Sequence, residues 1–367
     1  MPKFKVHRSN QAQKQQGKSL KIKDKRGRGG TFIFLLLSFI LSFTQASFAG
    51  EEAGAFLSLG VGARAIGLGG AFTGMADDGT AFYWNPAGLS RLSRREATMM
   101  YSSLFGLSDA LASYHVLAYA HPLRGIHFSV GWIRLSVDDI PRYPELKYGN
   151  DPEKRTRRVR DMALQGDGVP EGYFTDREDA VYLSFSKMNE FEVDMGWQYF
   201  AFRLQVPIGV SFKFLRYAID QSSAGGVGID LGTMLLFGVD ELLDNASLGK
   251  ASLGLVVQDV ANTAIIWKSR HQDTIPYNLK FGAAYDQPIP RFNSRVVLLW
   301  EIESRDKGTH HVGIEYRYAE RLALRIGYDE HRVAVGAGIT FRMLRVDYAL
   351  SNYDLGFIHR ASASLRF

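Results

Sequence analysis

Apolar residues recur at every second position along much of the chain from residue 96 onward. Leu322, Leu324 and Ile326, for example, are separated by small or charged residues such as Arg325. Because successive side chains of a β-strand point to opposite faces, this pattern predicts strands with one apolar face and one polar face. The chain is therefore expected to be an all-β protein.

Fourteen such segments can be counted, and single-chain bacterial membrane barrels have an even number of strands. We therefore expect a transmembrane antiparallel β-barrel, although a soluble sandwich would show the same alternation. Charges and glycines on the polar face and aromatic residues towards the strand ends favour a wet lumen and an interfacial girdle. Residues 188–206 fit either a strand extension or a short helix. The expected strands are 97–106, 111–120, 126–136, 179–187, 208–217, 226–236, 250–259, 277–285, 294–303, 311–319, 321–329, 332–342, 343–352 and 355–367.

An uncharged apolar run at residues 31–43 follows a basic segment and precedes the small residues of Ser47-Phe-Ala49. This layout is typical of a secretory signal peptide. The run is shorter than the roughly 20 apolar residues that a membrane-spanning helix needs. We expect residues 1–49 to be a signal peptide with a basic N-terminal extension, cleaved near Ala49, and the remainder to reach the bacterial outer membrane.

The positive charge of the chain comes from this leader. Residues 1–30 contain ten Lys or Arg and one acidic residue, a charge of +9, whereas the whole chain carries +6, so the remainder carries −3. A basic surface for nucleic acid would therefore be removed with the leader, and no nucleic-acid partner is expected. The chain has no cysteine, which excludes a catalytic thiol and any disulfide.

A glycine-rich segment, residues 60–89, stands between the leader and the first strand. It contains Gly62-Ala-Arg-Ala65, Gly67, Gly69-Gly-Ala71, Ala76-Asp-Asp78 and Asn85-Pro-Ala-Gly-Leu89. This series resembles the start of the PorV/PorQ family, which is related to type IX secretion. It is more distantly similar to the FadL-like long-chain fatty acid transporters. The resemblance implies that residues 50–95 fold as a plug inside a barrel formed by residues 96–367.

The resemblance also implies a protein that is not an enzyme. A PorV/PorQ-type protein would handle or anchor secreted proteins at the cell surface, with type IX secretion components or cargo proteins as partners. A FadL-like channel would instead take up hydrophobic small molecules such as long-chain fatty acids. Both families share the motif, so it does not separate them. We assign its residues to the conformation of the plug: Gly62, Arg64, Gly67, Gly69, Gly70, Asp77, Asp78, Asn85 and Pro86.

Other patterns predict no catalytic, metal or cofactor site. Gly60-Val-Gly62 has no third glycine at the spacing of a dinucleotide-binding motif, since the next glycine is Gly67, and it directly follows the export signal. The pair Asp77-Asp78 is expected to cap a short helix at Gly79–Trp84, which ends before Asn85-Pro86. His310-His311 has no third ligand in the sequence, and neighbours on a strand point to opposite faces. An enzyme at the barrel rim is a third possibility, but no Ser/His/Asp arrangement supports it.

Three further features bear on the membrane. The long loop 138–178 is expected on the extracellular side, because periplasmic turns are short. Its basic cluster either is a solvated loop face or contacts anionic groups of the outer-membrane lipid; the cluster consists of Lys154, Arg155, Arg157, Arg158 and Arg160. Phe367 ends a strand and resembles the C-terminal signal for barrel assembly. Charged residues on the polar strand faces are expected to pair inside the lumen: Lys213, Asp230, Lys280, Glu301, Glu303, Glu315, Arg317, Arg325, Arg345 and Asp347.

Overall fold

The computed structural model describes residues 21–23, 53–106, 110–143, 170–194, 201–305, 309–329, 332–353 and 356–367. The expected cleavage site and apolar run of the leader lie outside these residues, as does the basic cluster 154–160.

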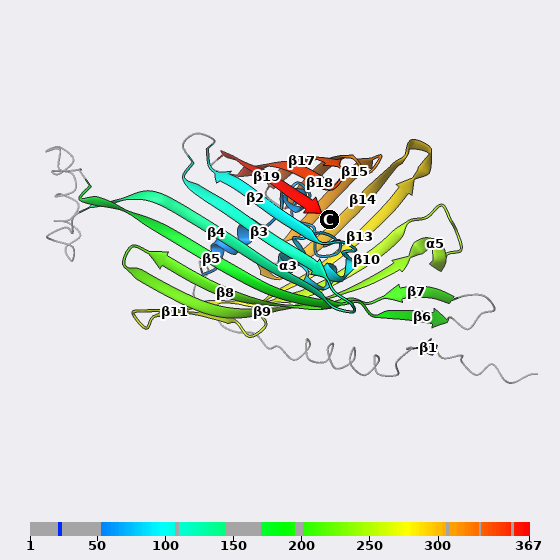
Figure 1. Ribbon diagram of the computed structural model, residues 1–367, viewed down its shortest axis with the longest axis horizontal. Helices are drawn as coiled ribbons and strands as arrows, with labels where there is room; N and C mark the ends of the chain where they lie inside the picture. The colour runs from blue at the N-terminus through cyan, green and yellow to red at the C-terminus, as the bar shows by residue number, and fades with distance from the viewer. Residues whose placement is uncertain are drawn as a thin grey trace, which may run out of the picture.

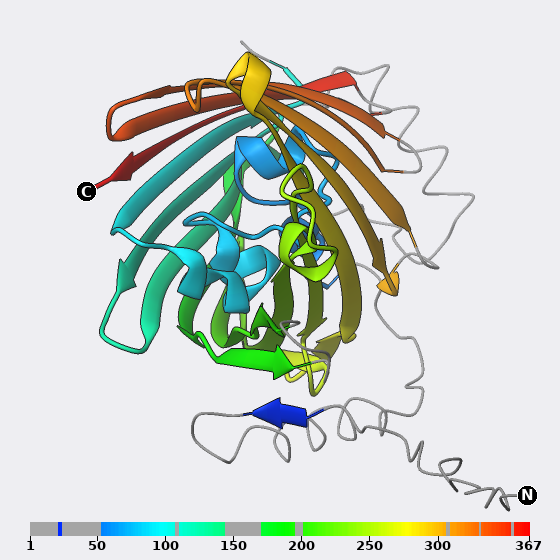
Figure 2. The same cartoon turned by 90° about the vertical axis from the view of Figure 1, so that its right-hand side faces the viewer.

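Fourteen antiparallel strands of the described chain form one closed barrel (Figures 1 and 2). Each strand pairs with its neighbours in chain order, and the last strand pairs with the first over His359↔Ser103 to Arg366↔Glu96. In this order the strands are β2 (Glu96–Leu104), β3 (Ala112–Pro122), β4 (His127–Arg142), β5 (Gly172–Lys187), β8 (Ile208–Ile219), β9 (Ser222–Gly238), β10 (Lys250–Gln258), β13 (Asn278–Ile289), β14 (Ser294–Glu303), β15 (His310–Tyr318), β16 (Leu322–Asp329), β17 (Arg332–Phe341), β18 (Leu344–Tyr353) and β19 (Gly356–Arg366).

The fourteen predicted strands are thus confirmed, with differences at their ends. β4 and β5 extend well into the predicted loop 138–178, with an irregular register between Val137 and Ile140. Figure 1 shows these two strands reaching far beyond one end of the barrel. We propose that this end, at which β4 leads to β5, faces the cell exterior, because the long connections of such barrels are extracellular. The short turn between β17 and β18 lies at the opposite end, which is then the periplasmic one.

Two hairpins were not predicted as such. Within the ambiguous stretch 188–206, β6 (Glu190–Asp194) pairs with β7 (Ala201–Gln205), so this stretch contains a hairpin and not a helix over its described residues. The other hairpin, β11 (Thr263–Trp267) with β12 (Gln272–Ile275), attaches to the extracellular part of β9. A three-residue strand, β1 (Lys21–Lys23), pairs with β6.

The outer face of the barrel is apolar. Alternate residues of β16 are exposed, with 63% of Leu324 and 52% of Ile326 accessible, while Arg325 between them is buried. Exposed aromatic side chains lie near the periplasmic end at Tyr318 and Phe341. An apolar band with aromatic residues near its edge fits a lipid bilayer. The protein is therefore a transmembrane barrel of the outer membrane.

The stretch of residues 53–92, ahead of β2, lies inside the barrel (Figure 2). It forms four short helical turns, η1 (Ala55–Leu59), α2 (Ala63–Ile66), α3 (Ala81–Trp84) and η2 (Pro86–Arg91). The other helical turns, α5 (Val239–Leu242) and η3 (Pro290–Phe292), connect strands of the wall. None of the helices in the described residues is long and apolar enough to cross a membrane.

Charge insertion on one strand tests the lipid-facing assignment. Replacing Ile326 with Arg, near the middle of β16, should cost roughly 2–4 kcal/mol and impair assembly, because a cation near the bilayer midplane is poorly solvated. The matched change Leu322→Arg, on the same outer face but at the strand end, should cost about 0–1 kcal/mol. Assembly is measured by the different gel migration of unboiled and boiled samples, and equal tolerance at both positions would contradict the assignment.

Candidate functional site

Residues 53–92, here called the lumen segment, cross the interior of the barrel and are almost entirely buried. Gly62 and Gly69 have φ values of 82° and 67°, which side chains with a Cβ rarely adopt, and they separate the short helical turns. Such irregular backbone is tolerated at membrane depth only where protein or a water-filled cavity surrounds it. The barrel wall supplies that surrounding.

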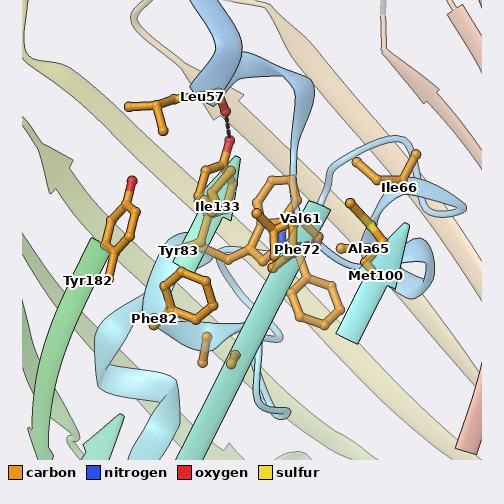
Figure 3. Close-up of a cluster of buried hydrophobic side chains, with 14 of the residues drawn as sticks. Leu57, Val61, Ala65, Ile66, Phe72, Phe82, Tyr83, Met100, Ile133 and Tyr182 are labelled. Carbon is orange, nitrogen blue, oxygen red and sulfur yellow. Dashed lines mark hydrogen bonds between the residues drawn. The ribbon is translucent and has the colours of Figure 1, made fainter. Parts of the chain in front are cut away.

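One side of the lumen is apolar. Phe82 of α3 packs edge-on against Tyr182 of β5, with the ring centroids 5.1 Å apart, and Phe56 packs in the same way against Tyr217 of β8 at 5.7 Å. Figure 3 shows Ile133 of β4 in the same cluster. The buried hydroxyl of Tyr83 donates to the carbonyl oxygen of Leu57, so the cluster also ties two turns of the segment together.

The opposite side of the lumen is charged. Six side chains, five of them buried and Arg345 partly exposed, alternate in sign and form a closed ring, here called the charge ring. Its ion pairs are Arg64–Glu315 (3.1 Å), Glu315–Arg325 (2.6 Å), Arg325–Asp347 (2.8 Å), Asp347–Arg345 (2.9 Å), Arg345–Asp78 (2.9 Å) and Asp78–Arg64 (3.2 Å). The lumen segment contributes one cation and one anion, and strands β15, β16 and β18 contribute the other four.

The charge ring is electrically balanced, with three cations and three anions. Burial alone would raise the pKa of Asp78, but Arg345 and Arg64 outweigh burial and hold that pKa well below its usual range. Removing a single partner from a buried ion pair usually costs about 3–5 kcal/mol, because the remaining charge is left unpaired in a dry environment. The ring therefore fixes the lumen segment to the wall.

Further lumen charges also pair, as expected from the sequence. Lys213 of β8 lies 2.9 Å from Asp230 and 2.8 Å from Asp259, and all three are buried. Lys280 of β13 lies 2.8 Å from the Glu303 carboxylate. The lumen thus holds its charges in compensated groups.

The backbone of the lumen segment is hydrogen-bonded to the wall as well. The Glu301 carboxylate accepts from the backbone N–H groups of Phe72 and Thr73 at 2.9 and 2.8 Å. The Asn85 side chain donates to the carbonyl oxygens of Thr73 (3.1 Å) and Thr233 (3.2 Å), and accepts from the N–H of Ala87. Asn85 therefore joins two parts of the segment to β9.

Glycines of the wall allow this close approach. At several inward-facing strand positions, an added Cβ would collide with the backbone of the lumen segment: Gly209, Gly254, Gly282, Gly313 and Gly327. Gly67 and Gly74 of the lumen segment lie against the wall in the same way: an added Cβ would lie 3.1 Å from the Cα of Gly336 and 2.8 Å from the nitrogen of Ala283, respectively.

The predicted roles of Asp77 and Asp78 need correction. The observed helix α3 covers only Ala81–Trp84, starting two residues later than predicted, and it ends before Asn85 as expected. Asp78 accepts from the backbone N–H of Thr80, just ahead of the helix, but its other oxygen belongs to the charge ring. Asp77 instead pairs with Arg64 at 2.5 Å. The sequence could not reveal the contacts with the wall, because Glu315, the wall partner of Arg64, and Arg345, the wall partner of Asp78, lie more than 200 residues away along the chain.

A polar cavity of about 130 Å³ separates the lumen segment from the wall formed by β13 to β18. Glu303, His311 and Arg332 line it, together with Trp84 of α3. The His311 ring nitrogen Nδ1 lies 2.7 Å from the carbonyl oxygen of Gly69, so His311 also holds the segment. No group of three His, Cys, Asp or Glu side chains suited to a metal occurs among the described residues.

The last residue of the chain lies at the barrel seam. Phe367 exchanges two backbone hydrogen bonds with Arg95, directly before β2, and its side chain is exposed. Its role as an assembly signal stays a prediction.

No protein-family model and no curated protein matches this chain. Among solved structures, it is similar to a deletion mutant of the TodX monoaromatic hydrocarbon channel, with 12% identity, a TM-score of 0.47, and coverage of 84% of this chain and 98% of that one. The CymD monoaromatic hydrocarbon channel has 9% identity, a TM-score of 0.48 and the same coverage. The Acinetobacter baumannii outer membrane protein Omp33 has 6% identity and a TM-score of 0.32 over 75% of this chain and 98% of that one. Similarity at these levels says nothing about what this chain binds.

The charge ring predicts a large loss of stability for Arg64→Gln. Three carboxylates, of Asp77, Asp78 and Glu315, would lose a partner, and the free energy of unfolding should fall by roughly 3–5 kcal/mol. Arg295→Gln is the matched control, since its partly exposed pairs with Asp286 and Glu320 should contribute at most about 1 kcal/mol. Unfolding is followed in urea by tryptophan fluorescence, and equal losses for both variants would show that the ring does not anchor the segment.

The wall glycines predict a steric effect. A Cβ at Gly327 would overlap the backbone of Gly69, so Gly327→Ala should displace the lumen segment and raise the conductance of the barrel in planar bilayers. Gly225→Ala is the control, because the nearest atom to its new Cβ lies at an ordinary 3.4 Å. If a folded Gly327→Ala barrel has the conductance of the original protein, the lumen segment shifts without opening a path for ions, and the prediction is wrong.

Proposed function

We propose that this protein is an outer-membrane channel through which hydrophobic small molecules enter the cell, with the lumen segment as its plug. The observation that carries the proposal is the apolar cluster inside the barrel, in which Phe56, Phe82 and Tyr83 pack against inward-facing residues of the wall. The interior of a general diffusion porin is polar. An aromatic lumen instead offers an apolar solute a favourable transfer from water, roughly 25 cal/mol per Å² of buried apolar surface.

The plug favours the selective passage of solutes and not their free diffusion through the barrel. A barrel of fourteen strands is too wide for its own side chains to fill, so an empty lumen would be an aqueous pore. Residues 53–92 occupy that space, and any solute must pass beside them. The resemblance of residues 60–89 to the FadL-like transporters points in the same direction.

A second candidate is the PorV/PorQ-type role of anchoring secreted proteins at the cell surface. The firm attachment of the lumen segment favours it, since the charge ring, Glu301 and the wall glycines all hold the segment in place. A permanently closed barrel would suit a protein that acts as a docking platform. The same resemblance of residues 60–89 supports this alternative too.

An uptake measurement separates the two functions. The protein is produced in a Gram-negative host whose outer leaflet of lipopolysaccharide slows apolar solutes, and entry of the fluorescent probe N-phenyl-1-naphthylamine is followed. We expect faster entry with the protein than without it, and no change in the entry of a hydrophilic solute. An Ile326→Arg variant serves as the control for expression, once its heat-dependent gel migration shows that it does not assemble.

Equal probe entry with and without the assembled protein would contradict the channel. If deletion of the gene in the native cell then released surface proteins into the medium, the anchoring role would be supported instead.

A further inference from the structure

A row of inward-facing residues crosses the extracellular part of the apolar wall. It runs over strands β3, β4, β5, β8, β9 and β11. Each strand contributes one residue, which lies directly opposite the residue contributed by the neighbouring strand. In order, these residues are Tyr114, Leu135, Glu178, Tyr217, Ala224 and Trp267. Every member except Glu178 is apolar or aromatic, so a carboxyl group stands in the middle of an apolar surface.

The Glu178 carboxylate has no compensating partner. It is half-buried, and in the described part of the chain it accepts no hydrogen bond and forms no ion pair. The charged group that acts on it is the carboxylate of Asp176, two residues earlier on the same face of β5. Two carboxylates on one apolar surface repel each other and are poorly solvated. All the other lumen charges discussed above are paired, which makes this one distinctive.

Tyr114 is a second unsatisfied group of the row. Its side chain is fully buried, and its hydroxyl finds no hydrogen-bond partner among the described residues. Tyr114 lies two strands from Glu178 in the same row, with Leu135 between them. A buried polar group without a partner costs about 1–3 kcal/mol, so an N–H donor placed between Glu178 and Tyr114 would relieve both.

Aromatic rings follow Glu178 along the row, beginning with Tyr217 on the neighbouring strand. Tyr217, directly opposite Glu178, has its ring centroid 5.7 Å from that of Phe56 and 6.3 Å from that of Trp267. Rings of this kind attract a cation through their negative faces and also contact an apolar body. A metal ion is less suitable, because Ca²⁺ and Mg²⁺ need six or more oxygen ligands or several retained waters.

From this arrangement we propose that the row binds a hydrophobic organic cation, an alkyl- or arylammonium ion. The ammonium group donates to the Glu178 carboxylate, Asp176 adds a second negative charge, and the apolar part packs against Tyr217 and Trp267. This goes beyond the proposed channel, because it assigns a charge to the ligand, and binding does not require that the ligand cross the membrane.

Three ligands of similar shape test the proposal on the unaltered, full-length protein in a non-ionic detergent. Phenethylammonium is the cation, 3-phenyl-1-propanol the neutral analogue and 3-phenylpropionate the anion. Isothermal titration should show phenethylammonium binding at least about tenfold more tightly than either, since a hydrogen bond to a charged group contributes that much or more. Equal affinity for the three, or preference for the anion, would overturn the proposal without any variant being made.

Variants then locate the site. Glu178→Gln should weaken phenethylammonium binding about ten- to hundredfold, while Glu178→Asp should retain most of the binding. Glu190→Gln, an exposed carboxylate on β6, is the matched control and should leave affinity unchanged. A folded Glu178→Gln protein, identified by heat-dependent gel migration, that binds as tightly as the original would overturn the assignment.

The chain itself supplies one competing occupant, the basic cluster of the β4–β5 connection. Replacing Arg157, Arg158 and Arg160 with Gln should not alter the affinity for phenethylammonium. Binding that appears only after this replacement would overturn the proposal, because the loop and not a ligand would then satisfy Glu178.

Discussion

Every structural feature described above depends on the closure of the sheet. Inside a bilayer no water is available to the backbone, so an open strand edge would leave a row of unsatisfied N–H and C=O groups. The pairing of β19 with β2 removes both edges at once. Closure also divides the side chains into two sets. The outer set is apolar and faces lipid, whereas the inner set can be charged, polar or apolar.

The inner set is used in two different ways. Along β13 to β18 the wall presents charges, and these are compensated with the help of Arg64 and Asp78 from the lumen segment. Along β3 to β9 the wall also holds the paired Lys213 and Asp230, but it presents many aromatic and aliphatic residues, which pack against Phe56 and Phe82. The lumen segment is therefore held by ion pairs on one side and by apolar contact on the other.

This division has a functional consequence. The charged side resists movement, because displacing Arg64 would leave several buried carboxylates unpaired. The apolar side makes fewer directional contacts with the segment, and its extracellular part contains the unpaired Glu178. If a solute enters the barrel, the apolar side is where it finds favourable contacts, whereas the polar cavity beside His311 is lined by groups that already satisfy one another. Both candidate functions use the same architecture and differ in whether the apolar side is a path or a packed core.

The strands and their inward and outward faces were determined by the sequence itself. Period-two alternation is local, and it survives in every strand because lipid and lumen impose opposite demands on neighbouring residues; this is why β14, for example, lies at the predicted residues 294–303. The resemblance of residues 60–89 likewise indicated a segment within the lumen.

The sequence did not indicate the partners of that segment. Arg64 meets Glu315, and Gly69 meets Gly327, only because barrel closure brings residues together that are some 250 positions apart. In the sequence, Glu178 is one of several acidic residues of the predicted loop 138–178. It stands out only because strand pairing extends β5 and places Tyr217 and Leu135 directly beside it. Local pattern determined which residues face inward, and the tertiary structure alone decided which of them are paired and which are not.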